Sequence, residues 1–167
     1  MQRVRIRIKG LPAEWAGACR RAVTDLNAEF RKKHINVTLE ADGVTGPLIT
    51  VQTDASIQGT AVHGRTHAEF DGSGVMLSAA VRLPVDVLIN TPAKLRNAGG
   101  GVLEVIAGHE FVHALGHEPH NTHLMSQTMY KEAGDRPGQD KLKGGTVYLP
   151  PLVLSDDSVT LLQSIWN

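Results

Sequence analysis

The stretch HEFVHALGHEPHNTH, residues 109–123, holds five of the eight histidines in a chain of 167 residues, and it begins with an HExxH pair. A helix over residues 102–115 would place His109 and His113 four residues apart on one face, where both imidazoles reach a single metal ion. Glu110 would then lie beside that ion and not on it. The apolar residues between them predict a helix buried under a sheet.

Zinc is the metal that this pair of ligands favours. It accepts imidazole nitrogen, takes three protein ligands in catalytic sites and keeps a fourth position for water. A carboxylate next to that water can take its proton, and Glu110 is the candidate for this role. HExxH also occurs by chance, and histidine-rich stretches bind metal without chemistry. A non-catalytic zinc-binding protein, in which further histidines close the coordination sphere, is therefore the alternative function.

The residues after the pair indicate how a third ligand can reach the same ion. Gly116 permits the left-handed turn that ends a helix and returns the chain, which would bring a later histidine back. A methionine follows soon after, in Leu124-Met125-Ser126.

These residues resemble the metzincins, and among them the matrixin-like zinc endopeptidases. The match consists of HEFVHALG, a later histidine, and Leu124-Met125-Ser126 in the place of the family's Met-turn. A second match is LSDDSVTLLQ, residues 154–163, which resembles the LSxDDxxGIQ segment that opens the matrixins' last helix. A third and weaker match joins Gly59-Thr60-Ala61 to GVMLSAAVRL, residues 74–83, which is similar to the strand that borders the family's cleft.

The chain departs from the family at the third ligand. The longer signature, HExxHxxGxxH, places its last histidine where this chain has Pro119, whose side chain cannot bind zinc. His120 lies one residue later and is the favoured ligand, since a slightly longer turn would deliver it. His117 lies two residues earlier and, on a continuing helix, would sit about 6 Å along the axis from His113. His123, or a two-histidine site completed by water, is the remaining alternative.

The choice of third ligand also affects which methionine is expected in the Met-turn. With His120 as ligand, Met125 follows rather soon, and Met129 becomes a rival for the Met-turn. Pro119 also motivates a second alternative function, a zincin-fold module with an inactive site. The resemblance further implies that an aspartate at the start of the last helix, Asp156 or Asp157, supports the Met-turn from beneath.

The order of predicted elements agrees with this resemblance. Residues 3–9 alternate basic and apolar side chains as a strand with one solvated face, and residues 12–33 have the apolar spacing of a long amphipathic helix. Strands are expected at residues 35–39, 48–52, 60–70 and 75–83, the last two joined by a hairpin at Asp71-Gly72-Ser73-Gly74.

The resemblance implies an α+β fold of the zincin type. We expect a mixed twisted sheet, a long backing helix, the active-site helix, and a small irregular C-terminal subdomain that ends in a helix. The chain is predicted to form a single metalloprotease-like domain, residues 1–167. Its sheet-and-helix part would be residues 1–116, and its part with the Met-turn and last helix residues 117–167.

A cleft is expected between the edge of the sheet and the active-site helix. An extended peptide can pair its backbone with an edge strand, which gives affinity without demanding one side-chain sequence. Residues 75–83 are the candidate edge, and an ordinary inner strand is an equally good interpretation. His63 and His67, in the strand before, are interpreted as surface or hydrogen-bonded histidines and not as a second metal site.

The composition of the chain disfavours some classes of binding partner. With 17 basic and 17 acidic residues the chain has no net charge, and aromatic residues make up 4% of it. These values disfavour nucleic acid and an anionic membrane as partners. The resemblance implies a peptide or protein substrate, and a monomer is expected. Cys19 is the single cysteine, and it is interpreted as a small buried thiol.

The sequence also predicts a location. No apolar run is long enough to span a membrane, and the N-terminus lacks the apolar core of a secretory signal. A cytoplasmic protein is therefore expected, although a phage-encoded protein or a domain exported without a visible signal would have the same pattern. Together these observations predict a zinc-dependent endopeptidase, with zinc on His109, His113 and His120 and with Glu110 as general base.

Overall fold

The structure, a computed structural model, describes residues 1–57, 64–90, 95–126, 141–142, 145–146 and 152–167. The predicted α+β class is confirmed within these residues, which form a five-stranded, mostly parallel sheet and three α-helices. The elements are β1 (Gln2–Arg7), α1 (Ala13–Lys32), β2 (Val37–Ala41), β3 (Leu48–Asp54), β4 (Arg65–Phe70), β5 (Met76–Pro84), β6 (Leu88–Asn90), β7 (Leu95–Asn97), α2 (Gly100–Ala114), the 3-10 helix η1 (His123–Met125), β8 (Lys141–Leu142), β9 (Gly145–Thr146) and α3 (Asp156–Trp166).

The main sheet has the strand order β2-β1-β3-β5-β4. Neighbouring strands are parallel except β4 and β5, which form an antiparallel hairpin. The predicted hairpin turn is confirmed, because the carboxylate of Asp71 accepts hydrogen bonds from the main-chain nitrogens of Ser73 and Val75. The hairpin places β4 at the outer edge of the sheet.

The prediction that residues 75–83 form the edge strand is wrong. β5 pairs with β3 on one side and with β4 on the other, so it is an inner strand. In the described part of the chain β4 pairs with β5 alone, and β4 is therefore the edge. Residue alternation identifies the buried face of a strand, but it does not count the strand's neighbours.

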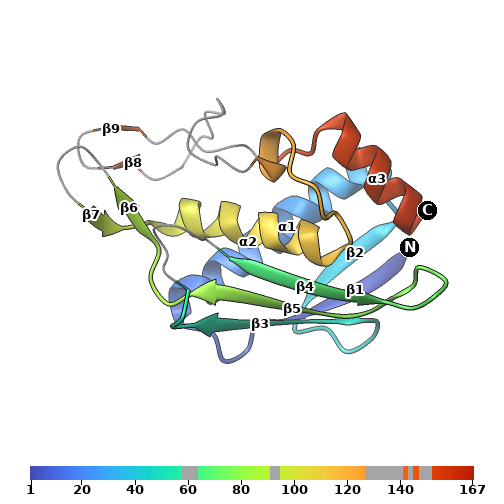
Figure 1. Cartoon of the computed structure of the whole chain (residues 1–167), viewed down its shortest axis with the longest axis horizontal. Helices are drawn as coiled ribbons and strands as arrows, with labels where there is room; N and C mark the ends of the chain where they lie inside the picture. Colours follow the sequence, from blue (N-terminus) through green and yellow to red (C-terminus); the bar gives the residue numbers. More distant parts are fainter. Residues whose placement is uncertain (58–63, 91–94, 127–140, 143–144, 147–151) are drawn as a thin grey trace.

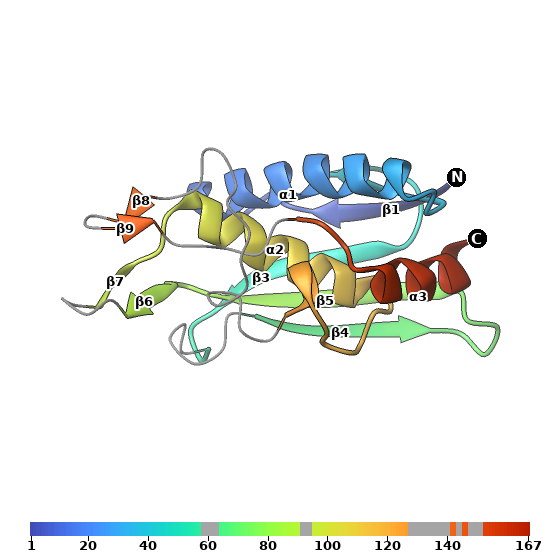
Figure 2. The ribbon, with the colours of Figure 1, turned by 90° about the horizontal axis from the view of Figure 1, so that it is seen from above.

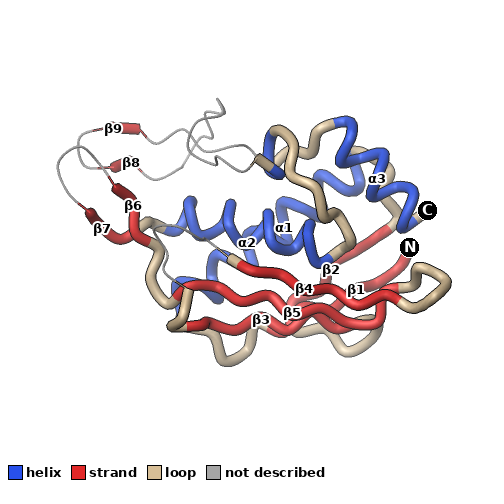
Figure 3. Tube along the Cα trace, in the orientation of Figure 1, coloured by secondary structure: helices blue, strands red, loops and turns tan. Residues whose placement is uncertain are grey.

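Both long helices lie over the same face of the sheet, as Figures 1 and 2 show. β1 illustrates the division of faces: Val4 and Ile6 are fully buried toward the helices, whereas Arg3 and Arg7 are exposed on the other side. The predicted solvated face of this strand is confirmed. The tube view in Figure 3 shows the resulting two layers, with the helices on one side and the five strands of the main sheet on the other.

The backing helix α1 forms close to the predicted range of 12–33. Its buried side chains recur at the spacing of one helical face, from Trp15 through Cys19 and Leu26 to Phe30. Burial raises the pKa of the Cys19 thiol to about 12, so this cysteine is an inert core residue, as predicted.

The motif helix α2 is buried on all sides, and residues 102–112 are all buried. It lies between α1 and the C-terminal segment, and an ion pair of 3.0 Å joins Arg21 of α1 to Glu104 of α2. A helix enclosed in this way has a fixed axis, and this fixes where its histidines point.

The C-terminal helix α3 secures the end of α2. The indole nitrogen of Trp166 donates to the carbonyl of Leu115 over 3.0 Å, and Trp166 is 3% exposed. The side-chain amide of Gln2 in turn donates to the carbonyl of Trp166, so the two chain ends lie side by side (Figure 1). None of the described helices combines the length and apolarity that crossing a membrane requires.

Candidate metal centre

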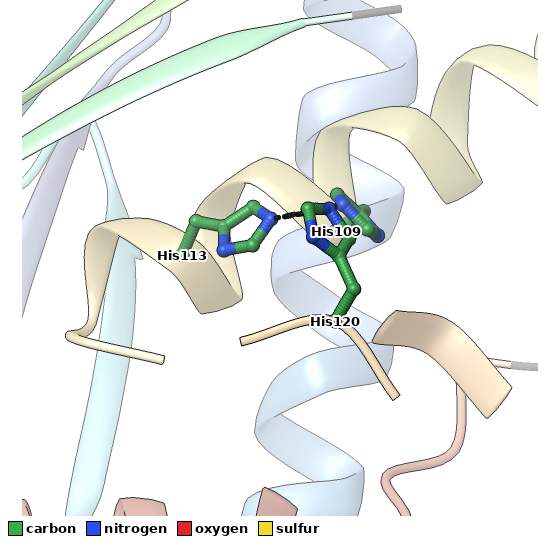
Figure 4. Close-up of side chains that lie close together, drawn as sticks. All are labelled: His109, His113 and His120. Atoms are coloured by element: carbon green, nitrogen blue, oxygen red, sulfur yellow. Dashed lines mark hydrogen bonds between the residues drawn. The ribbon is translucent and has the colours of Figure 1, made fainter. Parts of the chain in front are cut away.

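Three histidine side chains meet beside the C-terminal half of α2. Nε2 of His113 lies 3.0 Å from Nε2 of His109 and 3.3 Å from Nε2 of His120. One ligand nitrogen from each residue lies within 4.8 Å of the other two. Figure 4 shows the three rings gathered together, two from α2 and one from the loop that follows it. Such a group can hold a metal ion.

Main-chain carbonyls hold the other nitrogens of the two helical histidines. Nδ1 of His109 donates to the carbonyl oxygen of Leu124 at 2.8 Å, and Nδ1 of His113 donates to that of His117 at 2.6 Å. A carbonyl oxygen only accepts, so each Nδ1 carries its proton and each Nε2 of a neutral ring presents a lone pair. Metal-binding histidines commonly have such outer partners.

Burial keeps these rings neutral. It lowers the pKa of His109 to about 3, and it also lowers the pKa of His113. In their neutral forms the two rings direct lone pairs at each other across 3.0 Å, which is unfavourable unless a cation lies between them. The donors therefore fit a metal ion that accepts imidazole nitrogen.

The turn after α2 explains how the chain returns to the centre. Gly116 has a φ of +98°, its main-chain nitrogen donates to the carbonyl of His113, and the nitrogen of His117 donates to the carbonyl of Val112. These two bonds form the Schellman motif, which ends a helix at a left-handed residue. The chain then reverses, and His120 reaches the two histidines of α2.

The side chains of the other two histidines of the stretch, His117 and His123, do not belong to this group of metal donors. His117 is 1% exposed, and its ring nitrogens have no hydrogen-bond partner among the described residues, whereas its carbonyl holds His113. His123 is exposed, and its Nδ1 lies 2.9 Å from the hydroxyl oxygen of Thr122. The structure thus brings the side chain of His120 to His109 and His113. It does not bring the side chain of His117 or of His123 there.

Glu110 lies next to this group, on the side of the edge strand. It is 6% exposed, and burial raises its pKa to about 7, against the opposing effect of a hydrogen bond from Thr66. The Thr66 hydroxyl donates to Oε2 of Glu110 over 2.5 Å. A carboxyl group with a pKa near neutrality can both take and return a proton at physiological pH.

A cleft of about 750 Å³ opens on the centre. Glu110, the three grouped histidines and the edge strand β4 line it. Residues of the β4–β5 hairpin and of α3 also line it, among them Phe70, Ser73 and Ile165. His67 of β4 is exposed, in agreement with its interpretation as a surface histidine, whereas His63 lies outside the described residues.

The loop from 121 to 126 supports the centre from the C-terminal side. Met125 is fully buried in η1, and its carbonyl accepts from the main-chain nitrogen of Asn121. The side-chain amide of Asn121 donates to the hydroxyl of the buried Ser158, in the first turn of α3. Through Leu124, whose carbonyl holds His109, this loop transmits its position to the ligands.

Within the described residues, neither Asp156 nor Asp157 hydrogen-bonds to the loop that holds Met125. Asp156 and Asp157 are both exposed, and Asp156 forms an ion pair of 3.5 Å with Lys33. Ser158 takes the supporting place because it is the residue of this turn that faces inward. Met129, the rival for the Met-turn, lies outside the described residues, as do Gly59-Thr60-Ala61.

Comparison with known proteins assigns no family, since neither a protein-family model nor a curated protein matches this chain.

Sequence reasoning missed two kinds of residue at the centre. One consists of Leu124 and His117, whose main-chain carbonyl oxygens accept from the two helical histidines; the sequence gives no signal for them, because any residue type can offer such an oxygen. The other is Thr66, which touches Glu110 from the edge strand. Alternation does place Thr66 on the inward face of residues 65–70, so a signal for its orientation existed, but nothing in the sequence paired it with Glu110.

Proposed function

We propose that this protein is a zinc-dependent endopeptidase of the metzincin type. The observation that carries the proposal is the combination of His109, His113 and His120, grouped as metal donors, with the buried carboxyl group of Glu110 in the wall of the same open cleft. Three histidines leave the fourth position of a tetrahedral zinc site for water, which is the arrangement of catalytic sites.

Zinc is the proposed metal because all three donors are imidazole nitrogens: His109 is buried, His113 is half-buried, and His120 is an exposed loop residue. When bound, zinc supplies Lewis-acid chemistry: it lowers the pKa of water toward about 7 and polarises a carbonyl group. Glu110 takes the proton of the attacking water and passes it to the leaving amine. Its pKa of about 7 suits both transfers.

The edge strand β4 supports a peptide as the substrate. β4 borders the cleft, and in the described part of the chain its outer edge has no strand partner. A peptide in extended conformation would add to this edge as a further strand, with its scissile bond opposite Glu110. The order of the described elements, with an antiparallel edge strand beside the HExxH helix, is also what the zincin fold would have.

The alternative is a zinc-binding protein without catalysis, which would need a closed coordination sphere. Among the described His, Cys, Asp and Glu residues, the grouping at this centre contains three members and no fourth. A zincin-type module with an inactive site is the other alternative. Pro119 motivated it, but His120 reaches the centre in spite of that proline.

Glu110→Gln tests the proposal. We expect this variant to keep one zinc per chain and to hydrolyse a denatured protein at least about 100-fold more slowly, since the proton acceptor is lost. Glu118→Gln is the matched control, because Glu118 is an exposed carboxylate in the wall of the same cleft. Unchanged turnover in Glu110→Gln contradicts the assignment of the base. Zinc binding without hydrolysis in the parent protein supports the non-catalytic alternative.

A further inference from the structure

We propose that Thr66 and Gly64, at the start of the edge strand, together form a seat that positions the carboxyl group of Glu110. In this seat Thr66 is a positioning residue that acts through a hydrogen bond, and Gly64 provides the space. The inference rests on the proposed function, because it concerns the residue that we assign as the base.

The hydrogen bond from Thr66 fixes one oxygen of Glu110. The Thr66 hydroxyl lies 2.5 Å from Oε2 and 3.3 Å from the main-chain oxygen of the same residue. Since a hydroxyl has a single hydrogen, the shorter distance assigns that hydrogen to the carboxyl group. A bond of 2.5 Å is short for this pair of atom types, and it lies in a half-buried place where water competes weakly.

Gly64 leaves room for the rest of the carboxyl group. A Cβ atom on Gly64 would lie 2.5 Å from both Cδ and Oε1 of Glu110, closer than Cβ atoms approach other heavy atoms. The backbone of Gly64 is not in the left-handed region, so its conformation does not demand glycine. The absence of a side chain therefore matters here because the Glu110 carboxyl group occupies that space.

The two contacts make the carboxyl oxygens different. Oε2 is held by Thr66, and no hydrogen bond from another described residue reaches Oε1. Under the proposed function, Oε1 is therefore the oxygen that is left to receive the proton of the attacking water. Because Thr66 belongs to β4, along which a peptide would lie, and Gly64 directly precedes this strand, the seat also aligns the base with the bound substrate.

Three threonine variants test the seat by kinetics. We expect Thr66→Val to lower kcat about 10- to 100-fold with KM changed less than about threefold, because the base loses its orientation while the cleft is kept. Thr66→Ser restores the hydroxyl, and its kcat should return to within about threefold of the parent value. Thr50→Val is the matched control, since Thr50 is a half-buried threonine of β3 whose hydroxyl donates to Ala79. A kcat of Thr66→Val within twofold of the parent value overturns the proposal.

Two glycine variants test whether the Glu110 carboxyl group needs the space beside Gly64. Gly64→Ala should lower kcat to a similar extent as Thr66→Val, and its crystal structure should show the Glu110 carboxyl group displaced from Thr66. Gly72→Ala is the matched control, because a Cβ on Gly72 meets nothing within 4 Å and its φ is not positive. An undisplaced Glu110 in Gly64→Ala contradicts the proposed role of Gly64.

A readout without catalysis separates this inference from the proposed function. In the metal-free protein, Thr66→Val should lower the urea midpoint of unfolding when residue 110 is glutamate, and at least half of this effect should vanish in a Glu110→Ala background. Thr50→Val should lower the midpoint equally in both backgrounds. Equal effects of Thr66→Val in both backgrounds overturn the seat. A parent protein that shows the coupling but no hydrolysis keeps the seat and contradicts the peptidase.

Discussion

At the scale of single residues, the two ring nitrogens of His109 and His113 have separate tasks. Each Nδ1 donates to a carbonyl oxygen, which selects the tautomer, and each Nε2 then presents its lone pair to the centre. Burial works in the same direction, because it disfavours the protonated ring. Glu110 experiences the same low-dielectric surroundings, and for a carboxyl group they raise the pKa.

The pKa of Glu110 predicts a pH dependence of stability in the metal-free protein. The pKa of this carboxyl group is about 7 in the folded protein, against an ordinary value of 4.5. Between these values the unfolded chain releases the proton while the folded chain keeps it, so stability falls as the pH rises. Glu110→Gln has no such proton. It should therefore be more stable than the parent by about 3 kcal/mol near pH 8 and nearly equal to it near pH 4.

Urea unfolding of both proteins at about pH 4, 6 and 8, with metal removed by a chelator, measures this difference. The histidines are common to both proteins, so their own titration cancels in the comparison. A stability difference that is the same at all three pH values would show that Glu110 titrates normally in the folded state.

At the scale of elements, the end of α2 decides whether the third histidine reaches the other two. The Schellman turn at Gly116 reverses the chain there, and the turn is also tightly enclosed. A Cβ on Gly116 would lie 2.9 Å from Cζ of Phe70 and 3.0 Å from Cδ1 of Ile165. The helix end, the edge strand and α3 therefore meet at this one glycine.

Gly116→Ala should destabilise the protein for two reasons, the left-handed backbone and the crowding against these two side chains. Gly10→Ala is a control that isolates the first reason, because Gly10 has the same φ of +98° and a Cβ there meets nothing within 4 Å. We expect Gly10→Ala to cost about 1 kcal/mol of unfolding free energy and Gly116→Ala about 2–3 kcal/mol. Gly116→Ala alone should also weaken metal binding. Equal losses in stability and unchanged metal affinity would contradict this account of the turn.

Periodicity predicted the individual elements well and their pairing less well. The range expected for the backing helix, 12–33, is within a residue of α1 at each end, because one face of this helix carries nearly all of its large apolar residues. The edge strand was assigned wrongly because β4 and β5 both alternate, and alternation does not reveal which of two paired strands has a second neighbour.

The residues of the site also divide into those that the sequence predicts and those that it does not. HExxH on a helix fixes His109 and His113 by local geometry, so the sequence was sufficient for their placement. Choosing among His117, His120 and His123 required the path of a loop, and the path depends on how Gly116 packs against distant side chains. Thr66 was missed for a similar reason, since it and Glu110 are 44 residues apart in sequence.

At the scale of the whole molecule, the centre adds a link between the sheet-and-helix part of the chain and the segment that follows it, which already share one hydrophobic core. Two histidines come from α2, the third comes from the loop after it, and that loop is tied to α3 through Asn121 and Ser158. A metal ion bound by all three would therefore hold the C-terminal segment against the sheet-and-helix part. Whether these two parts, 1–116 and 117–167, divide as the sequence suggests stays a prediction.

Metal binding should accordingly stabilise the entire fold. This stabilisation should depend on the side chain of His120 and not on that of His117. With zinc at about 1,000 times its Kd, linkage gives about 4 kcal/mol, or a rise in Tm of about 10 °C for a chain of this size.

His120 is exposed, so His120→Ala should leave the Tm of the metal-free protein nearly unchanged and abolish most of the rise that zinc causes. His117 is 1% exposed and donates no side-chain nitrogen to the centre, so His117→Ala should lower the metal-free Tm and keep the rise. Thermal unfolding with and without zinc, at a fixed protein concentration, gives both quantities for each variant. The reverse pattern, with the rise lost in His117→Ala and kept in His120→Ala, would make His117 the third ligand and contradict the path of the chain after Gly116.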